Sequence, residues 1–121
     1  MYEYENKLID NMEDLKRVCR KATSYFVGSF MLELIMCRKE WENPETKLAF
    51  VKRFHNDYNV DGNIERTRNR INCVIRIIKS RMVEEALMYV INANDSKMTV
   101  PEAKENAIIT LKQIRSGKLK Y

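Results

Sequence analysis

The stretch "NIERTRNRINCVIRIIKSRM", residues 63–82, decides the fold class of this chain. Its apolar and small side chains recur three and four positions apart, which is the period of an α-helix with one buried face. Seven of them fall within an arc of about 120° on a helical wheel: Ile64, Thr67, Ile71, Val74, Ile75, Ile78 and Met82. The pattern predicts a long helix over about residues 63–93.

A second long helix is expected over about residues 3–41, where an apolar stripe runs from Leu8 to Phe26. A straight helix of this length would measure about 58 Å, whereas a compact domain of this size is roughly 35 Å across. We therefore expect this helix to bend or break near Thr23–Gly28; a second subunit that covers the overhang is the alternative. Residues 25–36 are apolar almost all round, as in a central core helix or a subunit interface.

Capping residues mark the limits of the other two helices. Asn43 and Pro44 predict the start of one, because asparagine caps helices and proline suits the first helical position. Its apolar face is expected to contain Leu48, Val51, Phe54 and Tyr58. In the last helix, Thr99 and Glu102 form a capping box at the start, and Gly117 supplies a left-handed cap at the end.

The whole chain, residues 1–121, is expected to form a single helical domain. It contains three glycines and two prolines, and 45% of its residues are hydrophobic, so it is neither low-complexity nor disordered. No alternating strand pattern competes with the four helical segments. The predicted fold class is all-α, a four- to five-helix bundle with a long first helix and a long third helix.

The segment "DYNVDGNIERTR", residues 57–68, follows the order of an EF-hand calcium loop over its first nine positions, as far as Glu65. The twelfth position of such a loop needs a bidentate carboxylate, and Arg68 stands there instead. We therefore interpret the segment as a helix–helix turn, with Asp61 or Asn63 capping the helix that follows.

The sequence offers little support for catalysis or for a metal site. Its single histidine, His55, falls on an apolar helical face, which is an unusual place for a general base. The cysteines Cys19, Cys37 and Cys73 lack the close spacing of a zinc site, and no glycine-rich phosphate loop is present. We expect no enzyme activity, no cofactor and no metal. Because no export signal is visible, we interpret the cysteines as free thiols of a cytoplasmic protein.

The helix over residues 63–93 carries the candidate functional residues. The chain has 22 lysines and arginines against 17 aspartates and glutamates, and the whole surplus lies after residue 63. The candidate partner-binding residues are Arg66, Arg68, Arg70, Asn72, Arg76, Lys79 and Arg81. Glu65 is the one acidic residue among them, and a guanidinium group forks onto phosphate oxygens. The structural alternative is that these long side chains only solvate the flanks of a core helix.

Two functions from different classes fit these observations. The first is a non-enzymatic regulator or inhibitor that binds nucleic acid, a nucleoprotein complex or a nucleic-acid-handling protein through the basic helix. The second is a protein–protein interaction module, either a homodimer or an immunity-type bundle, that acts through apolar surface at residues 25–36 or 83–93. No membrane partner is expected, because no apolar run reaches the roughly 18 residues needed to cross a bilayer.

Overall fold

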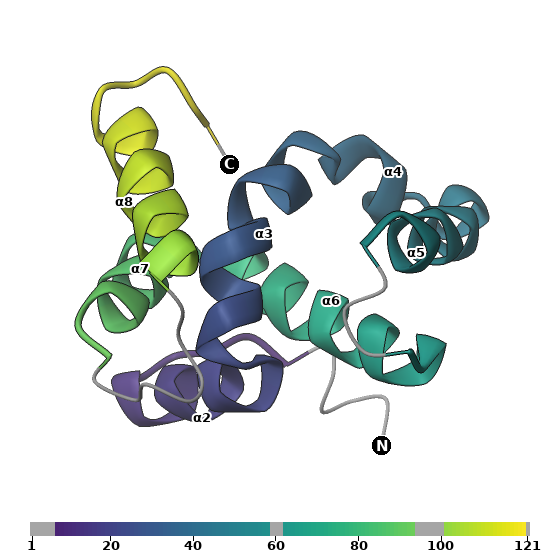
Figure 1. Cartoon of the computed structure of the whole chain (residues 1–121), viewed down its shortest axis with the longest axis horizontal. Helices are drawn as coiled ribbons and strands as arrows, with labels where there is room; N and C mark the ends of the chain where they lie inside the picture. The colour runs from purple at the N-terminus through teal and green to yellow at the C-terminus, as the bar shows by residue number, and fades with distance from the viewer. Residues whose placement is uncertain (1–6, 59–61, 94–100, 121) are drawn as a thin grey trace.

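The computed structural model describes residues 7–58, 62–93 and 101–120, and all regular secondary structure in these ranges is α-helical. The all-α prediction is confirmed for this part of the chain. Within it, none of the helices is long and apolar enough to cross a membrane. Figure 1 shows the helices, which are α2 (Met12–Ala22), α3 (Ser24–Met36), α4 (Arg38–Glu42), α5 (Pro44–Tyr58), α6 (Ile64–Lys79), α7 (Val83–Ile91) and α8 (Pro101–Arg115).

The expected long first helix is not confirmed as one element, because the chain divides it into α2, α3 and α4, and only the first of the two breaks was expected. Residues 7–10 are not helical, and α2 begins only after Asn11, whose side chain accepts a hydrogen bond from the Asp14 N–H. The break near Thr23–Gly28 is confirmed and lies at Thr23, which has a φ of +76°. The Thr23 hydroxyl then caps α3 by accepting a hydrogen bond from the Phe26 N–H. A further turn at Cys37 separates α3 from α4.

The expectation of one continuous helix over residues 63–93 is wrong, because α6 ends at Lys79 and α7 begins at Val83. The turn is a Schellman motif: the Met82 N–H bonds to the Ile77 carbonyl, and the Arg81 N–H bonds to the Ile78 carbonyl. Arg81 occupies its left-handed position with a φ of +58°. Glycine usually marks this position, so an arginine there gives no sequence signal. With these breaks, the described residues form seven helices, not four or five.

Local helix ends follow the sequence more closely. The Asn43 side chain accepts a hydrogen bond from the Glu45 N–H at the start of α5, and Asn63 accepts one from the Glu65 N–H at the start of α6. Gly117 has a φ of +80° after α8, as predicted. Asp61, Thr99 and the middle of the suggested calcium loop lie outside the described residues, so the capping box stays a prediction.

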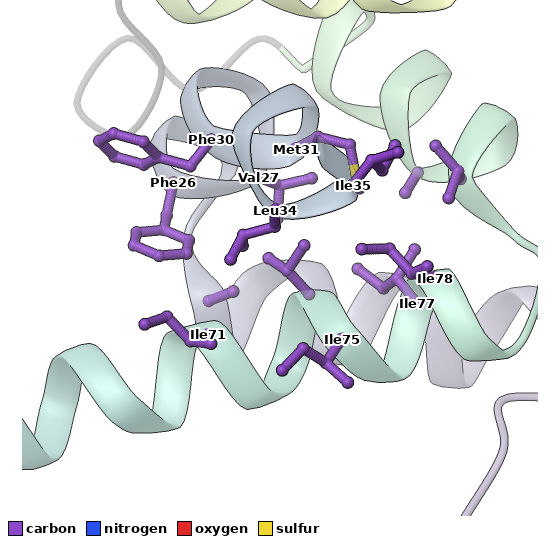
Figure 2. Close-up of a cluster of buried hydrophobic side chains, with 14 of the residues drawn as sticks. Phe26, Val27, Phe30, Met31, Leu34, Ile35, Ile71, Ile75, Ile77 and Ile78 are labelled. Carbon is purple, nitrogen blue, oxygen red and sulfur yellow. The ribbon is translucent and has the colours of Figure 1, made fainter. Parts of the chain in front are cut away.

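Helix α3 lies at the centre of the fold and packs against α2, α4, α6, α7 and α8. This position explains why residues 25–36 are apolar on nearly every face. Figure 2 shows the part of the core between α3 and α6, formed by Phe26, Val27, Phe30, Met31, Leu34, Ile35, Ile71, Ile75, Ile77 and Ile78. On another side, Gly28 faces α8, where a Cβ atom would lie 2.6 Å from the Ala103 carbonyl oxygen.

The buried face of α5 agrees with the expected one at Val51 and Phe54 but differs from it at Leu48 and Tyr58. Phe50, Val51 and Phe54 are buried, whereas Leu48 is 58% exposed and Tyr58 is 44% exposed. Phe54 is the middle of an aromatic cluster, because its ring centroid lies 5.1 Å from that of Phe30 and 4.7 Å from that of Tyr58. The core of α5 is therefore set by aromatic contacts to α3.

Candidate functional site

The basic residues of α6 differ in how far their side chains are exposed to solvent. The inward face of the helix holds Thr67, Ile71, Val74, Ile75, Ile77 and Ile78, all buried. Of the candidate partner-binding residues, Arg66, Lys79 and Arg81 are exposed, and Arg68, Arg70 and Asn72 are partly buried. Arg68 Nη1 lies 3.8 Å from Glu65 Oε2, and such an exposed pair holds its partners weakly. Six of the seven candidates are thus on or near the surface.

Arg76 is the exception, because this candidate partner-binding residue is buried and not on the surface. Its residue surface is only 8% exposed, and its Nε–H donates a hydrogen bond to the Lys7 carbonyl. Nearby, the Ile9 N–H donates a 2.7 Å hydrogen bond to the Ser80 hydroxyl. Arg76 therefore holds the segment before α2 against the end of α6. The contact joins residues distant in the chain, so helical periodicity could not reveal it.

Helix α2 supplies cationic residues that are not among the seven candidate partner-binding residues. It packs against α6 and carries Lys16, Arg17, Arg20 and Lys21. With Glu13 and Asp14 subtracted, α2 has a net charge of +2, and α6, with five cationic side chains and Glu65, has +4. The two helices, which we call the basic helix pair, therefore carry +6, whereas the whole chain carries +5.

The sequence did contain a signal for α2, the run "KRVCRK" at residues 16–21. It was hidden because the first 41 residues, taken together, have equal numbers of acidic and basic side chains. Only the folded arrangement, with α2 beside α6, places this run next to the second basic helix.

An open groove of about 800 Å³ lies beside the basic helix pair, between α2 and α7. Lys16 and Arg20 line it from α2, and Glu85 and Tyr89 line it from α7. Arg115 of α8 also lines it and places its Nε 3.1 Å from Glu84 Oε1, which ties the ends of α7 and α8 together. The α2–α7 groove thus has cationic side chains on one wall and anionic side chains on the other.

The contacts of His55, Cys19 and Cys37 lie within the helical fold. His55 Nδ1 lies 2.8 Å from the hydroxyl of buried Thr67, so the imidazole joins α5 to α6. Burial raises the pKa of the Cys19 thiol to about 12. Burial, reinforced by the neighbouring Glu33 and Glu40 carboxylates, raises that of Cys37 to about 12 as well. Both groups are therefore protonated thiols at neutral pH and poor nucleophiles.

No metal site is apparent in residues 7–58, 62–93 and 101–120, where no three histidine, cysteine or acidic side chains are grouped to hold an ion.

The apolar segments at 25–36 and 83–93 are mostly core. In the second of them Val83, Ala86, Leu87 and Val90 are buried. A smaller hollow of about 210 Å³ lies between α3, α5 and α8. Its rim carries Met36, which is 71% exposed, and Ile109, which is 49% exposed. This rim is an apolar surface that the fold leaves open to solvent near the end of α3.

Comparison with known proteins gives no guide to the chemistry of these surfaces: no family model, no curated protein and no solved structure matches this chain.

Proposed function

We propose that this chain is a small non-enzymatic regulator or inhibitor that binds nucleic acid through the basic helix pair. The observation that supports the proposal is the net charge of +6 on two adjacent helices, or +5 without the buried Arg76, in a chain whose total is +5. Lysine and arginine side chains that neutralise phosphates release the counterions around nucleic acid, and this release drives association. The exposed cations of the pair are Arg17, Arg20, Lys21, Arg66 and Lys79.

Arg76 has no part in the proposed contact surface, because it is buried against the segment before α2. Arg68 and Arg70 are partly buried, and their guanidinium groups add to the positive field of α6. Because the apolar face of α6 packs in the core, only its flanks are left for a ligand. The proposed contact is thus with the phosphate backbone, which fixes position and carries no base sequence.

Salt dependence tests this proposal directly. Five phosphate contacts, one for each exposed cation, give a slope of about −4.5 in log affinity against log salt, or a loss of roughly 500-fold between about 50 and 200 mM salt. The double variant Arg17→Glu/Arg66→Glu removes two of these contacts, so we expect a loss of only about 40-fold over the same range. Fluorescence anisotropy with a labelled duplex measures both slopes.

The matched control is Lys39→Glu/Lys52→Glu, which changes the net charge equally but at exposed positions of α4 and α5. It should lower affinity slightly and keep the steep slope, because it leaves the basic helix pair intact. Equal effects of the two double variants would show that only total charge matters and would refute a localised binding surface. Binding that does not respond to salt would refute the phosphate contact itself.

A second candidate function rests on the apolar rim around Met36 and Ile109, which are the most exposed apolar residues of the α3–α5–α8 hollow. We propose that this rim is where a homodimer would form, because a second copy would cover both side chains. Light scattering over a concentration series tests it. A concentration-dependent dimer that Met36→Lys dissociates supports the candidate, and a monomer at every concentration refutes it.

A further inference from the structure

The α2–α7 groove adjoins the basic helix pair, because α2 forms one wall of the groove and is also one helix of the pair. Lys16 and Arg20 lie on the wall of the groove, while Arg17 and Lys21 project from the exposed surface of the same helix. A phosphate chain held along α2 would therefore run past the mouth of the groove. A flexible strand bound there would have its bases next to an open cavity.

The groove has a size suited to one nucleotide unit. Its volume of about 800 Å³ lies within the range of roughly 300–1,000 Å³ typical of small-molecule pockets. Met12 and Met88 form apolar parts of its lining, and Tyr89 adds an aromatic ring. A flat, weakly polar base fits such a lining better than a hydrated ion does.

Tyr89 differs from the tyrosines of the aromatic cluster. The ring of Tyr58 lies against Phe30 and Phe54, and the ring of Tyr25 lies against Phe30. Tyr89 is only partly buried, and within the described ranges its ring has no aromatic partner and its hydroxyl no hydrogen bond. It is therefore the aromatic side chain of the groove that a ligand can stack on.

The two walls complete the chemistry of a nucleotide site. On the α2 wall, the side chains of Lys16 and Arg20 form no hydrogen bond or ion pair within the described part of the chain, so a phosphate can engage them. On the α7 wall, the Glu85 and Asn92 side chains likewise form no hydrogen bond to another described residue. A carboxylate accepts hydrogen bonds from the amino groups of bases, and an amide pairs with adenine.

From this arrangement we infer that the α2–α7 groove binds an unpaired base of single-stranded nucleic acid, with Tyr89 stacked on the base and Lys16 and Arg20 on its phosphate. The inference rests on the proposed function, and it narrows the ligand from any nucleic acid to a single strand whose bases are unpaired. A duplex can meet the basic helix pair through its phosphates, but its stacked and paired bases cannot enter the groove.

The test compares two labelled strands of about 16 nucleotides, the upper end of usual single-strand site sizes. One has normal bases, and in the other most nucleotides are replaced by stable abasic units with the same phosphates. We expect the wild-type protein to bind the normal strand roughly tenfold more tightly in fluorescence anisotropy, which is the usual effect of stacking one base on an aromatic ring. Tyr89→Leu should remove this difference, whereas Tyr89→Phe, which keeps the ring, should retain it.

Tyr25→Leu is the matched control, because Tyr25 is also a surface tyrosine but lies outside the groove. It should keep the preference for the normal strand. Equal binding of the two strands by the wild-type protein would overturn the groove inference and leave the basic helix pair as a phosphate-binding surface. Failure to bind either strand or a duplex at low salt would overturn the proposed function as well. The comparison of the normal and abasic strands with the wild-type protein still tests the groove inference if Tyr89→Leu does not fold.

Discussion

Arg76→Met separates the buried arginine of α6 from its exposed neighbours. The substitution keeps most of the packed stem but removes the guanidinium that donates to the Lys7 carbonyl. A hydrogen bond from a charged group contributes about 1.5–3 kcal/mol. Because Lys7 is exposed, water can reach the freed carbonyl, so the cost lies near the lower end, at about 1.5–2 kcal/mol. For a chain of this length, that loss lowers the melting temperature by about 6–8 °C.

Two measurements on the same protein check this reasoning. Thermal unfolding followed by circular dichroism gives the change in melting temperature, and anisotropy gives the salt slope of duplex binding. Arg76→Met should lower the melting temperature and leave the salt slope of duplex binding as in the wild type. Arg66→Gln, on the exposed surface of the same helix, should change the unfolding free energy by less than about 0.5 kcal/mol and reduce the magnitude of the salt slope by about 1.

The opposite pattern would refute the structural role of Arg76. An Arg76→Met protein that melts at the wild-type temperature and binds with a shallower salt slope would mean that this guanidinium faces solvent and phosphate. The hydrogen bond from Arg76 to the Lys7 carbonyl, which joins the segment before α2 to the end of α6, would then not exist in solution.

Three further changes have expected outcomes. Gly28→Ala should lower the unfolding free energy in urea titrations, because overpacking against the Ala103 carbonyl costs about 1–3 kcal/mol, more than the roughly 1 kcal/mol gained in helix propensity; a more stable variant would contradict the close approach of α3 and α8. Arg81→Gly should raise the melting temperature, since glycine relieves about 1 kcal/mol of left-handed strain; a lower value would argue against the Schellman turn. Cys19 and Cys37 have pKa values raised to about 12 from 9.0, so their contribution to stability is complete below pH 9 and is lost as the pH rises towards 12. Urea titrations across that interval should show a steeper decline in the wild type than in a Cys19→Ala/Cys37→Ser protein, and parallel declines would contradict the burial of Cys19 and the partial burial of Cys37.

Local signals in the sequence predicted the helical class and several helix ends. Asn43, Asn63 and Gly117 act on backbone groups within a few residues, so their roles can be recognised without knowing the fold. The break near Thr23 was predicted from the length of the helix and not from a local signal, and the break at Arg81 was not predicted. Both residues adopt positive φ without being glycine, and apolar periodicity continues across them. Tertiary packing, not local preference, sets these two turns.

The candidate site was predicted only in part, for the same physical reason. The surplus of arginine in α6 was visible, but the burial of Arg76 depends on Lys7, which is far away in the chain. Lys16 and Arg20 belong to the candidate site only because α2 packs beside α6 and α7. Periodicity describes one helix at a time, whereas a surface made by two helices depends on how they pack.

Because α3 is central, the protein cannot be shortened to a peptide of one basic helix without losing the arrangement of its charges. Since α3 packs against both α2 and α6, it holds the two cationic helices at a fixed separation. A synthetic peptide copied from either helix would supply the same charges without that spacing. Such a fragment would adhere to any polyanion, so minimal mimics of the basic helix pair must retain the hydrophobic helix beneath it.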